Sequence, residues 1–289
     1  MVNTELVFAD ENLGTWTEED RFEVTGDRMG EYAAATNDPI DAHRRGDVGA
    51  PVFAIVPVFE RMIEPAVDVV PLHIFGRGVH GEQDFHFHRP IRPGETLVSR
   101  AKMIGYEGLD NGTRAVVQVE CRGADGELVN EQYVTMFFRG EDASNGRKAG
   151  ELSPPHRLPE GIRDSEPVAK VAQHIDDDQT FRYAPASGDP VPIHLDEQSA
   201  KDAGLPGIIA HGLCTMAFAS WAVLTEVGDS EVARLRRLAV RFSKMVFPGD
   251  DLETRIWKVG SRNGITTYAF ETVRGTDVVL GDGLADIAD

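Results

Sequence analysis

The sequence has few cysteines and no long apolar run. Cys121 and Cys214 are the two cysteines among 289 residues, and each stands in an apolar context. This pattern predicts two buried thiols in a reducing compartment and excludes a disulfide-stabilised fold. No apolar run approaches the roughly 18 residues of a membrane-spanning helix. The first residues also lack a basic stretch followed by an apolar one, so we expect no signal peptide and a cytoplasmic protein.

Basic residues are few in relation to acidic ones. The chain has 48 Asp and Glu against 29 Lys and Arg, which gives a formal net charge of −19. Such a surface repels nucleic acids and anionic membranes, so neither is expected as a partner. Apolar residues make up 41% of the chain, with 14 Phe and 3 Trp, which is ample material for a core. At this length the chain suits two domains of roughly 130–150 residues, or one large domain.

Two sequence patterns occur twice and in the same order. An Asp-Pro pair with a His five residues after the Asp occurs at 38–43 and again at 189–194, 151 residues later. A Pro-Gly-acidic turn that opens a strand occurs at 92–97 and at 247–252, 155 residues apart. We interpret the chain as two copies of one unit. The alternative is a chance match in a chain rich in Pro and Gly.

A linker separates the two predicted copies. Gly, Pro, Ser and charged residues dominate the segment 141–166, and no apolar periodicity survives there. This composition is typical of a linker. The predicted organisation is therefore a first repeat over 1–140, the linker over 141–166 and a second repeat over 167–289.

Each copy has the same predicted order of elements. A short strand comes first, at 20–25 and 168–174, and a brief helical stretch and the Asp/His loop follow it. An apolar helix comes next. In the first copy it covers 53–63, where Pro57 should kink or shorten it, and in the second it covers 212–224 and should be buried on most faces. Strand-like runs close each copy, among them 116–121, 133–138 and 238–246. A buried helix wrapped by an antiparallel sheet is an α+β architecture.

The second Asp/His segment is the stronger candidate for a catalytic site. Tyr183 to His194 is expected to be a rigid loop, because Ser-Gly-Asp-Pro is a turn sequence. Asp189 and His194 could share one water: the imidazole accepts its proton as the oxygen attacks, and the carboxylate orients it. Addition of water to a double bond conjugated to a carbonyl also needs a donor for the developing oxyanion. The N–H of Gly212, at a helix start with no Cβ in the way, is such a donor.

Ordinary structural roles stay open for these residues. Asp189 could cap a helix, Asp196 could cap the following turn, and His211 could be a buried histidine with satisfied hydrogen bonds. Zinc binding by the histidines and Glu82 of the segment 80–88 is a further alternative. Their spacing is not typical of a closed site, and hydration of an activated alkene needs no metal, so we expect none.

The residues around the second segment resemble a known family. The pattern Tyr-Ala-x-x-Ser-Gly-Asp-x-x-Pro-Ile-His-x-Asp at 183–196, Ile-Ala-His-Gly at 209–212 and Phe-Pro-Gly-Asp at 247–250 are similar to the MaoC-like, (R)-specific enoyl-CoA hydratases, also called hydratase 2. The resemblance covers most of residues 180–255. The first copy is similar to the degenerate N-terminal half of the two-domain members. The resemblance therefore implies a double hot-dog fold.

The same resemblance implies a hydro-lyase of fatty acid metabolism that needs no cofactor. Water would add to a trans-2-enoyl thioester to give the (R)-3-hydroxyacyl product, or the reverse dehydration would occur. Asp189 and His194 would be the catalytic pair. The residues that bind the thioester oxygen or the substrate would be Gly212, His211, Tyr183 and Ser187. The acidic surface favours a CoA ester over an ester on an acidic carrier protein, and we expect a homodimer.

The chain departs from the family pattern in both copies. Val191 stands where the family usually has Asn, at a position that helps to place the loop or the ligand. In the first copy Ala-Pro-Val at 50–52 replaces the His-Gly helix start, and Pro51 has no N–H to donate. We therefore predict that Asp38 and His43 are a vestigial pair. The disrupted helix of this copy could open room for a longer or bulkier acyl chain.

Other functions stay open from the sequence. A dehydratase that acts on carrier-bound 3-hydroxyacyl groups is the nearest rival. A thioesterase on the same fold fits less well, because the rigid Asp/His loop and the His-Gly helix start suit alkene hydration. A non-catalytic acyl-binding or structural partner subunit is favoured by Val191 alone.

Overall fold

The computed structural model describes residue 5, residues 7–140 and residues 144–289. The chain divides into two compact units: the first is Met1–Phe22, Pro57–His86 and Thr96–Pro155, and the second is Glu23–Val56, Phe87–Glu95 and His156–Asp289. Residues 23–56 and 87–95 of the first sequence copy thus belong to the same unit as the whole second copy. Residues 1–4 and 6 of the predicted first repeat, and 141–143 of the predicted linker, lie outside the described residues.

The first unit is built on a sheet in the order β1-β3-β4-β5-β2, with β6 paired to β3. Strands β3, β4 and β5 pair antiparallel, and the buried Val117 and Val119 of β4 lie opposite Val134 and Gln132 of β5. The strands are β1 (Asp20–Glu23), β2 (Gly78–Phe87), β3 (Thr96–Leu109), β4 (Gly112–Gly123), β5 (Leu128–Arg139) and β6 (Lys148–Gly150). Short helical elements accompany them: η1 (Asp10–Asn12), α3 (Glu64–Val69) and α4 (Leu72–Phe75).

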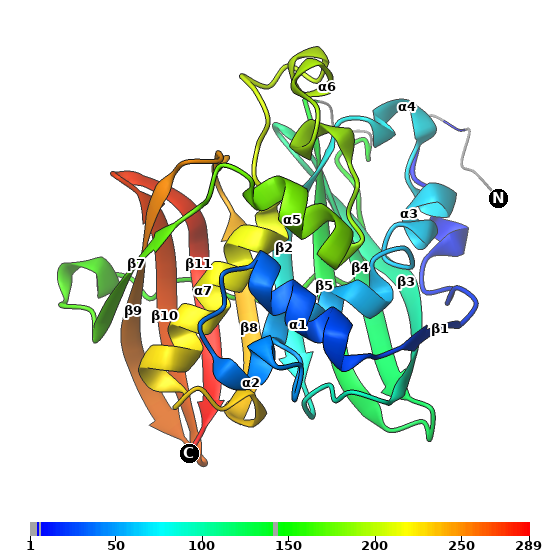
Figure 1. Cartoon of the computed structure of the whole chain (residues 1–289). Coiled ribbons are helices and arrows are strands. Elements are labelled where there is room, and N and C mark those ends of the chain that lie inside the picture. The colour runs from blue at the N-terminus through cyan, green and yellow to red at the C-terminus, as the bar shows by residue number, and fades with distance from the viewer. Residues whose placement is uncertain (1–4, 6, 141–143) are drawn as a thin grey trace. The chain divides into compact units, whose positions relative to one another are not determined.

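The second unit contains a sheet in the order β8-β11-β10-β9-β7 and one long buried helix, α7 (Gly212–Val227). The strands are β7 (Ala169–His174), β8 (Leu235–Phe242), β9 (Asp251–Arg262), β10 (Ile265–Arg274) and β11 (Asp277–Ala288), and two 3-10 turns are η3 (Ile162–Asp164) and η5 (Val232–Arg234). Helix α7 packs against these strands (Figure 1). Met216 and Phe218 on α7 are 0% and 1% exposed. Each such side chain contributes about 1.5–3 kcal/mol on burial, so packing holds α7 although no side chain caps its N-terminus.

The helical parts of both sequence copies repeat one backbone pattern within the second unit. In the first copy α1 (Gly26–Ala35) leads to α2 (Asp41–Arg44), and in the second α5 (Gln179–Ser187) leads to η4 (Pro192–His194). Helices α1 and α5 pack together (Figure 1). The Asp38 N–H donates to the Ala33 carbonyl just as the Asp189 N–H donates to the Ala184 carbonyl, 151 residues later. The sequence repeat is therefore also a repeat of hydrogen bonds.

The predicted elements are largely present. The α+β class is confirmed, as are the short strands near 20–25 and 168–174 and the buried helix that starts at Gly212. The helix of the first copy is a 3-10 helix, η2 (Pro51–Val58), with Pro57 inside it, so it is short as expected. Strand β8 ends at Phe242, earlier than the alternating pattern suggested. No helix within the described ranges is long and apolar enough to cross a membrane.

One predicted element is wrong. The segment from Tyr183 to His194 was expected to be loop throughout, but Tyr183 to Ser187 form the last turns of α5, with Pro185 inside the helix. Proline removes one helical N–H, whose acceptor would be the carbonyl of Phe181, four residues earlier. Pro185 stands two residues before the end of the helix, and the loop begins at Gly188.

Candidate active site

Helix α5 ends in a turn that places Asp189. Gly188 adopts a left-handed conformation with φ of 80°, which only glycine adopts without strain. The N–H groups of Gly188 and Asp189 both donate to the Ala184 carbonyl, at 2.9 and 3.2 Å. The Asp189 N–H also lies 3.3 Å from the Ser187 hydroxyl oxygen. Ser187 is 1% exposed, so its hydroxyl supports the turn.

The carboxylate of Asp189 is held by a main-chain group. Its Oδ1 accepts the Val191 N–H at 3.2 Å, which leaves Oδ2 for other partners. Any residue except proline can supply this N–H, so valine serves here as well as asparagine. The Val191 side chain is 40% exposed. The departure from the family pattern at this position therefore keeps this main-chain contact.

His194 has a defined tautomer. Its Nδ1 lies 2.8 Å from the Ile209 carbonyl oxygen, which can only accept, so Nδ1 carries the proton. The Nε2 lone pair is then free to take a proton from a reacting group. The His194 side chain as a whole is largely buried, at 9% exposure. Neutral His194 has the form that a general base requires.

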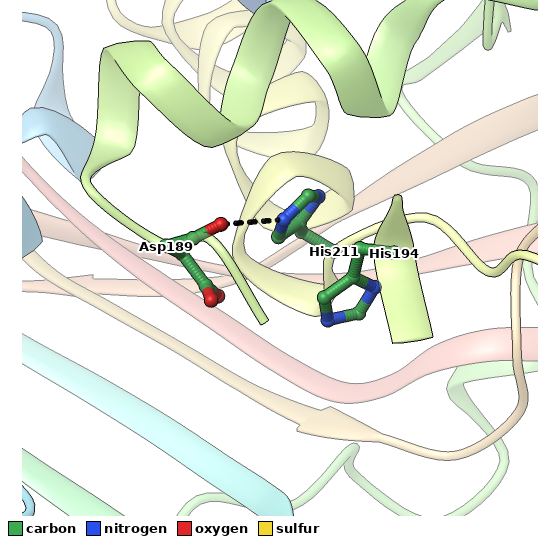
Figure 2. Close-up of side chains that lie close together, drawn as sticks. All are labelled: Asp189, His194 and His211. Carbon is green, nitrogen blue, oxygen red and sulfur yellow. Dashed lines mark hydrogen bonds between the residues drawn. The ribbon is translucent and has the colours of Figure 1, made fainter. Parts of the chain in front are cut away.

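His211 completes a compact group with this pair. One nitrogen of each histidine and one carboxylate oxygen of Asp189 lie within 4.8 Å of one another. The His211 Nε2–H donates to the main-chain carbonyl of Asp189 at 3.2 Å, as the dashed line in Figure 2 marks. The rings of His194 and His211 stack with centroids 3.9 Å apart. A water between the Asp189 carboxylate and His194 would be within hydrogen-bonding reach of both.

Tyr183 packs against His211 of this group. Its ring centroid lies 4.9 Å from that of His211, and its hydroxyl lies 3.3 Å from the hydroxyl of Tyr32. Tyr32 stands 151 positions before Tyr183, so equivalent residues of the two sequence copies contact each other. Both tyrosines are fully buried, and burial raises the pKa of each phenol. Both phenols therefore remain neutral at physiological pH.

Burial shifts the protonation of the catalytic pair in opposite directions. It lowers the pKa of His194 below its ordinary value, against the raising effects of the Ile209 carbonyl and of Asp189. It raises the pKa of the Asp189 carboxyl, against the lowering effects of His194 and of the Val191 N–H. Burial and the neighbouring His194 lower the pKa of His211 to about 3. Both imidazoles are thus neutral at physiological pH.

These shifts predict the acid limb of the pH–rate profile. Neutral His194 is needed as the base, and its pKa is lowered, so kcat/KM should fall only as the pH drops below the ordinary histidine value of about 6.5. Initial rates measured from about pH 4 to 9 check this, and the apparent pKa belongs to the Asp189–His194 pair jointly. An acid limb at or above about 6.5 would contradict a buried neutral base.

The start of α7 supplies a main-chain donor beside the pair. Gly212 is the first residue of α7, and His211 before it makes no side-chain cap. In the described part of the chain, no acceptor is paired with the Gly212 N–H, as expected for a first-turn amide. A Cβ on Gly212 would lie 3.1 Å from the Phe242 ring, so glycine keeps this approach open. The arrangement fits an oxyanion-binding N–H.

The stacked rings of this group differ from the usual arrangement of zinc ligands. Asp189, His194 and His211 form the one cluster of such residues within the described ranges that is close enough to share an ion. The two rings stack with their planes 27° apart, so their in-plane lone pairs lie in nearly parallel planes. Zinc ligands instead point at one centre from tetrahedral directions. In the segment 80–88, the other candidate for zinc, Nε2 of His86 lies 3.2 Å from a carboxylate oxygen of Asp84.

The first copy keeps the Asp/His pair, but the two side chains are buried and hydrogen-bonded to each other. His43 Nδ1 lies 2.7 Å from Asp38 Oδ2, and Asp38 Oδ1 accepts the Ile40 N–H at 2.8 Å. The two side chains are 0% and 1% exposed. Both carboxylate oxygens are thus occupied, whereas Asp189 makes no hydrogen bond to His194. A water or substrate has no access to a pair closed in this way.

The first copy also lacks the main-chain donor. The Gly49 N–H donates to the Ile91 carbonyl as the Ala210 N–H donates to the Val246 carbonyl, which aligns the two helix starts. Pro51 then takes the place of Gly212. Proline has no N–H, so this site has neither an accessible carboxylate nor an oxyanion donor. The structure thus supports the prediction that the first pair is vestigial.

The vestigial pair gives a test by substitution. Asp38→Asn combined with His43→Gln should leave kcat within a few-fold of wild type, because neither side chain reaches the second site. The free energy of unfolding should fall by about 1–3 kcal/mol, the cost of disturbing a buried hydrogen bond, and the melting temperature should fall with it. Steady-state kinetics and a melting curve on the same preparation measure both. Near-total loss of turnover in a folded double variant would overturn the vestigial assignment.

The sequence pointed to Asp189, His194, Gly212, His211, Tyr183 and Ser187, and the structure brings all six together. Three contributors were missed: the Ile209 carbonyl, the Phe242 ring and Tyr32. A sequence does not show which main-chain carbonyl will accept a hydrogen bond from a side chain. Tyr32 stands 151 residues before Tyr183, at the same offset as the Asp/His repeat, but that spacing did not predict the contact between the two hydroxyls.

Both sequence copies match known family models. The family described as MaoC like domain matches residues 161–279, and the family described as FAS1-like, dehydratase domain region matches residues 11–132. The chain is similar in fold to a crystal structure of a MaoC-like dehydratase from Phytophthora capsici, with a TM-score of 0.81 and 24% identity over 97% of this chain and 98% of that one. A Mycobacterium tuberculosis protein described as a double hotdog fold aligns with a TM-score of 0.59 and 12% identity over 96% of each chain. The predicted double hot-dog fold is confirmed.

Relatives of known name share about a third of the aligned residues. The 3-hydroxyacyl-thioester dehydratase Y of Mycobacterium tuberculosis is 33% identical over 217 residues, 72% of each chain. The probable enoyl-CoA hydratase 2 of Dictyostelium discoideum is 31% identical over 214 residues, 72% of this chain and 69% of that one. The peroxisomal multifunctional enzyme type 2 of Mus musculus is 30% identical over 82% of this chain, which spans 31% of that longer protein.

Proposed function

The chain belongs to the MaoC-like hydratase and dehydratase family, and we propose that it adds water to trans-2-enoyl-CoA to give (R)-3-hydroxyacyl-CoA, and catalyses the reverse dehydration. One observation carries the proposal. A neutral His194 with a free Nε2 lies with the Asp189 carboxylate beside an uncapped helix start. These are the base, the water-orienting group and the oxyanion donor that conjugate addition of water requires.

The proposed reaction follows from these three groups. The Asp189 carboxylate and His194 Nε2 hold one water between them, and His194 takes a proton as the water oxygen bonds to C3 of the enoyl group. Electrons of the double bond move onto the thioester oxygen, where the Gly212 N–H stabilises the enolate. The proton held by the pair then passes to C2, and the thioester carbonyl reforms. Asp189, whose pKa burial raises, is suited to exchange that proton.

Dehydration of a 3-hydroxyacyl thioester is the same sequence reversed. The relative named 3-hydroxyacyl-thioester dehydratase Y favours this direction, and the relative named enoyl-CoA hydratase 2 favours hydration. The net charge of −19 supports a CoA ester as the substrate, since an acidic carrier protein would be repelled. The exposed Arg241 has no acidic partner among the described residues and is a candidate for a phosphate of CoA.

Acyl chain length tests the role of the degenerate copy. Its apolar helix is reduced to the 3-10 helix η2, which we propose leaves room for a longer acyl chain than a full helix would. The value of kcat/KM should then rise from crotonyl-CoA to longer straight-chain substrates, by up to about fourfold for each methylene buried. A series of trans-2-enoyl-CoA esters measures this. Activity restricted to crotonyl-CoA would contradict the proposal.

We also propose a homodimer in the cytoplasm. The two cysteines are buried free thiols, which suits a reducing compartment. Light scattering coupled to size-exclusion chromatography tests the dimer, and a mass of one chain would refute it.

A further inference from the structure

We propose that His211 is a positioning residue, which holds the Asp189 main chain and the His194 ring in the geometry for hydration. This inference rests on the hydratase function proposed above. It differs from the role expected from the sequence, in which His211 binds the substrate or the thioester oxygen. It assigns no contact with the substrate to this side chain.

The contacts of His211 tie together the three parts of the site. Its Nε2–H donates to the carbonyl of Asp189 at 3.2 Å, which links the catalytic loop to the start of α7. Its ring stacks on His194 with centroids 3.9 Å apart, and the ring centroid of Tyr183 lies 4.9 Å from it. Gly212, the proposed oxyanion donor, is the next residue in the chain. One imidazole thus sets the relative position of the acid, the base and the N–H (Figure 2).

His211 has no proton to give to a substrate. Nε2–H is already used by the Asp189 carbonyl, and Nδ1 is a buried atom that carries no hydrogen in this tautomer. The side chain is 1% exposed. The titratable groups facing it are Asp189, His194 and Tyr183, and burial together with His194 keeps the pKa of His211 at about 3. The tautomer, and with it the hydrogen bond, should persist over the whole working pH range.

Two variants separate the hydrogen bond from the stacked ring. His211→Phe keeps an aromatic ring on His194 and removes the hydrogen-bond donor to Asp189. We expect kcat to fall by about 10²-fold, as it does when a catalytic group is misplaced by about 1 Å. KM and the acid limb of the pH–rate profile should stay unchanged. His211→Gln keeps an N–H for the Asp189 carbonyl and removes the ring. It should retain kcat within about tenfold, while water reaching His194 moves the acid limb to higher pH. Wild-type kcat and acid limb in both variants would overturn the proposal.

A measurement on the unmodified protein keeps the proposal testable where a variant fails to fold. Nitrogen-15 NMR of the histidine rings should show His211 protonated at Nε2, unprotonated at Nδ1 and unchanged from pH 8 to about pH 5. A His211 that is protonated at Nδ1 or titrates in that range would refute the assignment. This readout needs no turnover, so it separates failure of the positioning role from failure of the hydratase function.

Discussion

Replacement of Asp189 by asparagine is expected to lower kcat for enoyl-CoA hydration by about 10²–10⁴-fold, the contribution of a positioned acid–base group. Asparagine can still accept the Val191 N–H through Oδ1, so the turn should keep its shape. What disappears is the negative charge that orients the water and exchanges a proton with it. Steady-state kinetics on a trans-2-enoyl-CoA ester, with the product identified, measures the loss.

The repeat supplies a matched control for this substitution. Asp38 accepts the Ile40 N–H as Asp189 accepts the Val191 N–H, in the equivalent turn of the first copy. Asp38→Asn therefore makes the same chemical change in a sealed pair, and we expect turnover close to wild type. If both variants lose activity equally, the loss comes from folding. If Asp189→Asn keeps more than about a tenth of wild-type kcat, Asp189 is not the acid–base group.

Gly212→Pro is expected to lower kcat by about 10²–10³-fold, as removal of one oxyanion donor does. Proline is tolerated at the first position of a helix because that N–H has no intrahelical acceptor. The residue before it has ψ of 132°, which suits a following proline. The first copy already carries Pro51 at the equivalent position. The variant therefore removes the donor while α7 is expected to keep its place.

Gly212→Ala is the control for the added carbon atoms. Its Cβ would meet the Phe242 ring at 3.1 Å just as that of proline would, but it keeps the N–H. We expect Gly212→Ala to lose less activity than Gly212→Pro, and the ratio of the two isolates the hydrogen bond. Equal losses would show that steric contact with Phe242, and not the N–H, explains the effect.

The architecture and the residues of the site could be predicted from the sequence because the patterns that identify them recur at a fixed spacing. The offset of 151 residues identified the repeat, and the hydrogen bonds of Asp38 and Asp189 recur at the same offset. The choice of the second pair over the first depended on Gly212 against Pro51. The structure adds a second reason, since Asp38 is closed onto His43 while Asp189 remains available.

The parts that sequence reasoning missed depend on main-chain atoms and on long-range packing. The tautomer of His194 is set by the Ile209 carbonyl, and the loop is tied to α7 through the Asp189 carbonyl. No side-chain pattern encodes either contact. The Ser-Gly-Asp-Pro turn sequence made the expected loop start at Tyr183, whereas α5 continues to Ser187 with Pro185 inside it. The contact of Val191 with Asp189 is likewise a main-chain contact, which any residue except proline can make.

The most direct test of the account is the hydration of a series of trans-2-enoyl-CoA esters by the purified chain, followed by loss of the conjugated enoyl absorbance and by chiral analysis of the product. We predict turnover that yields the (R)-3-hydroxyacyl-CoA, rises with acyl length and is lost in Asp189→Asn but retained in Asp38→Asn. Absence of hydration of every ester, or an (S) product, would contradict the assignment of Asp189, His194 and Gly212 as a hydratase site.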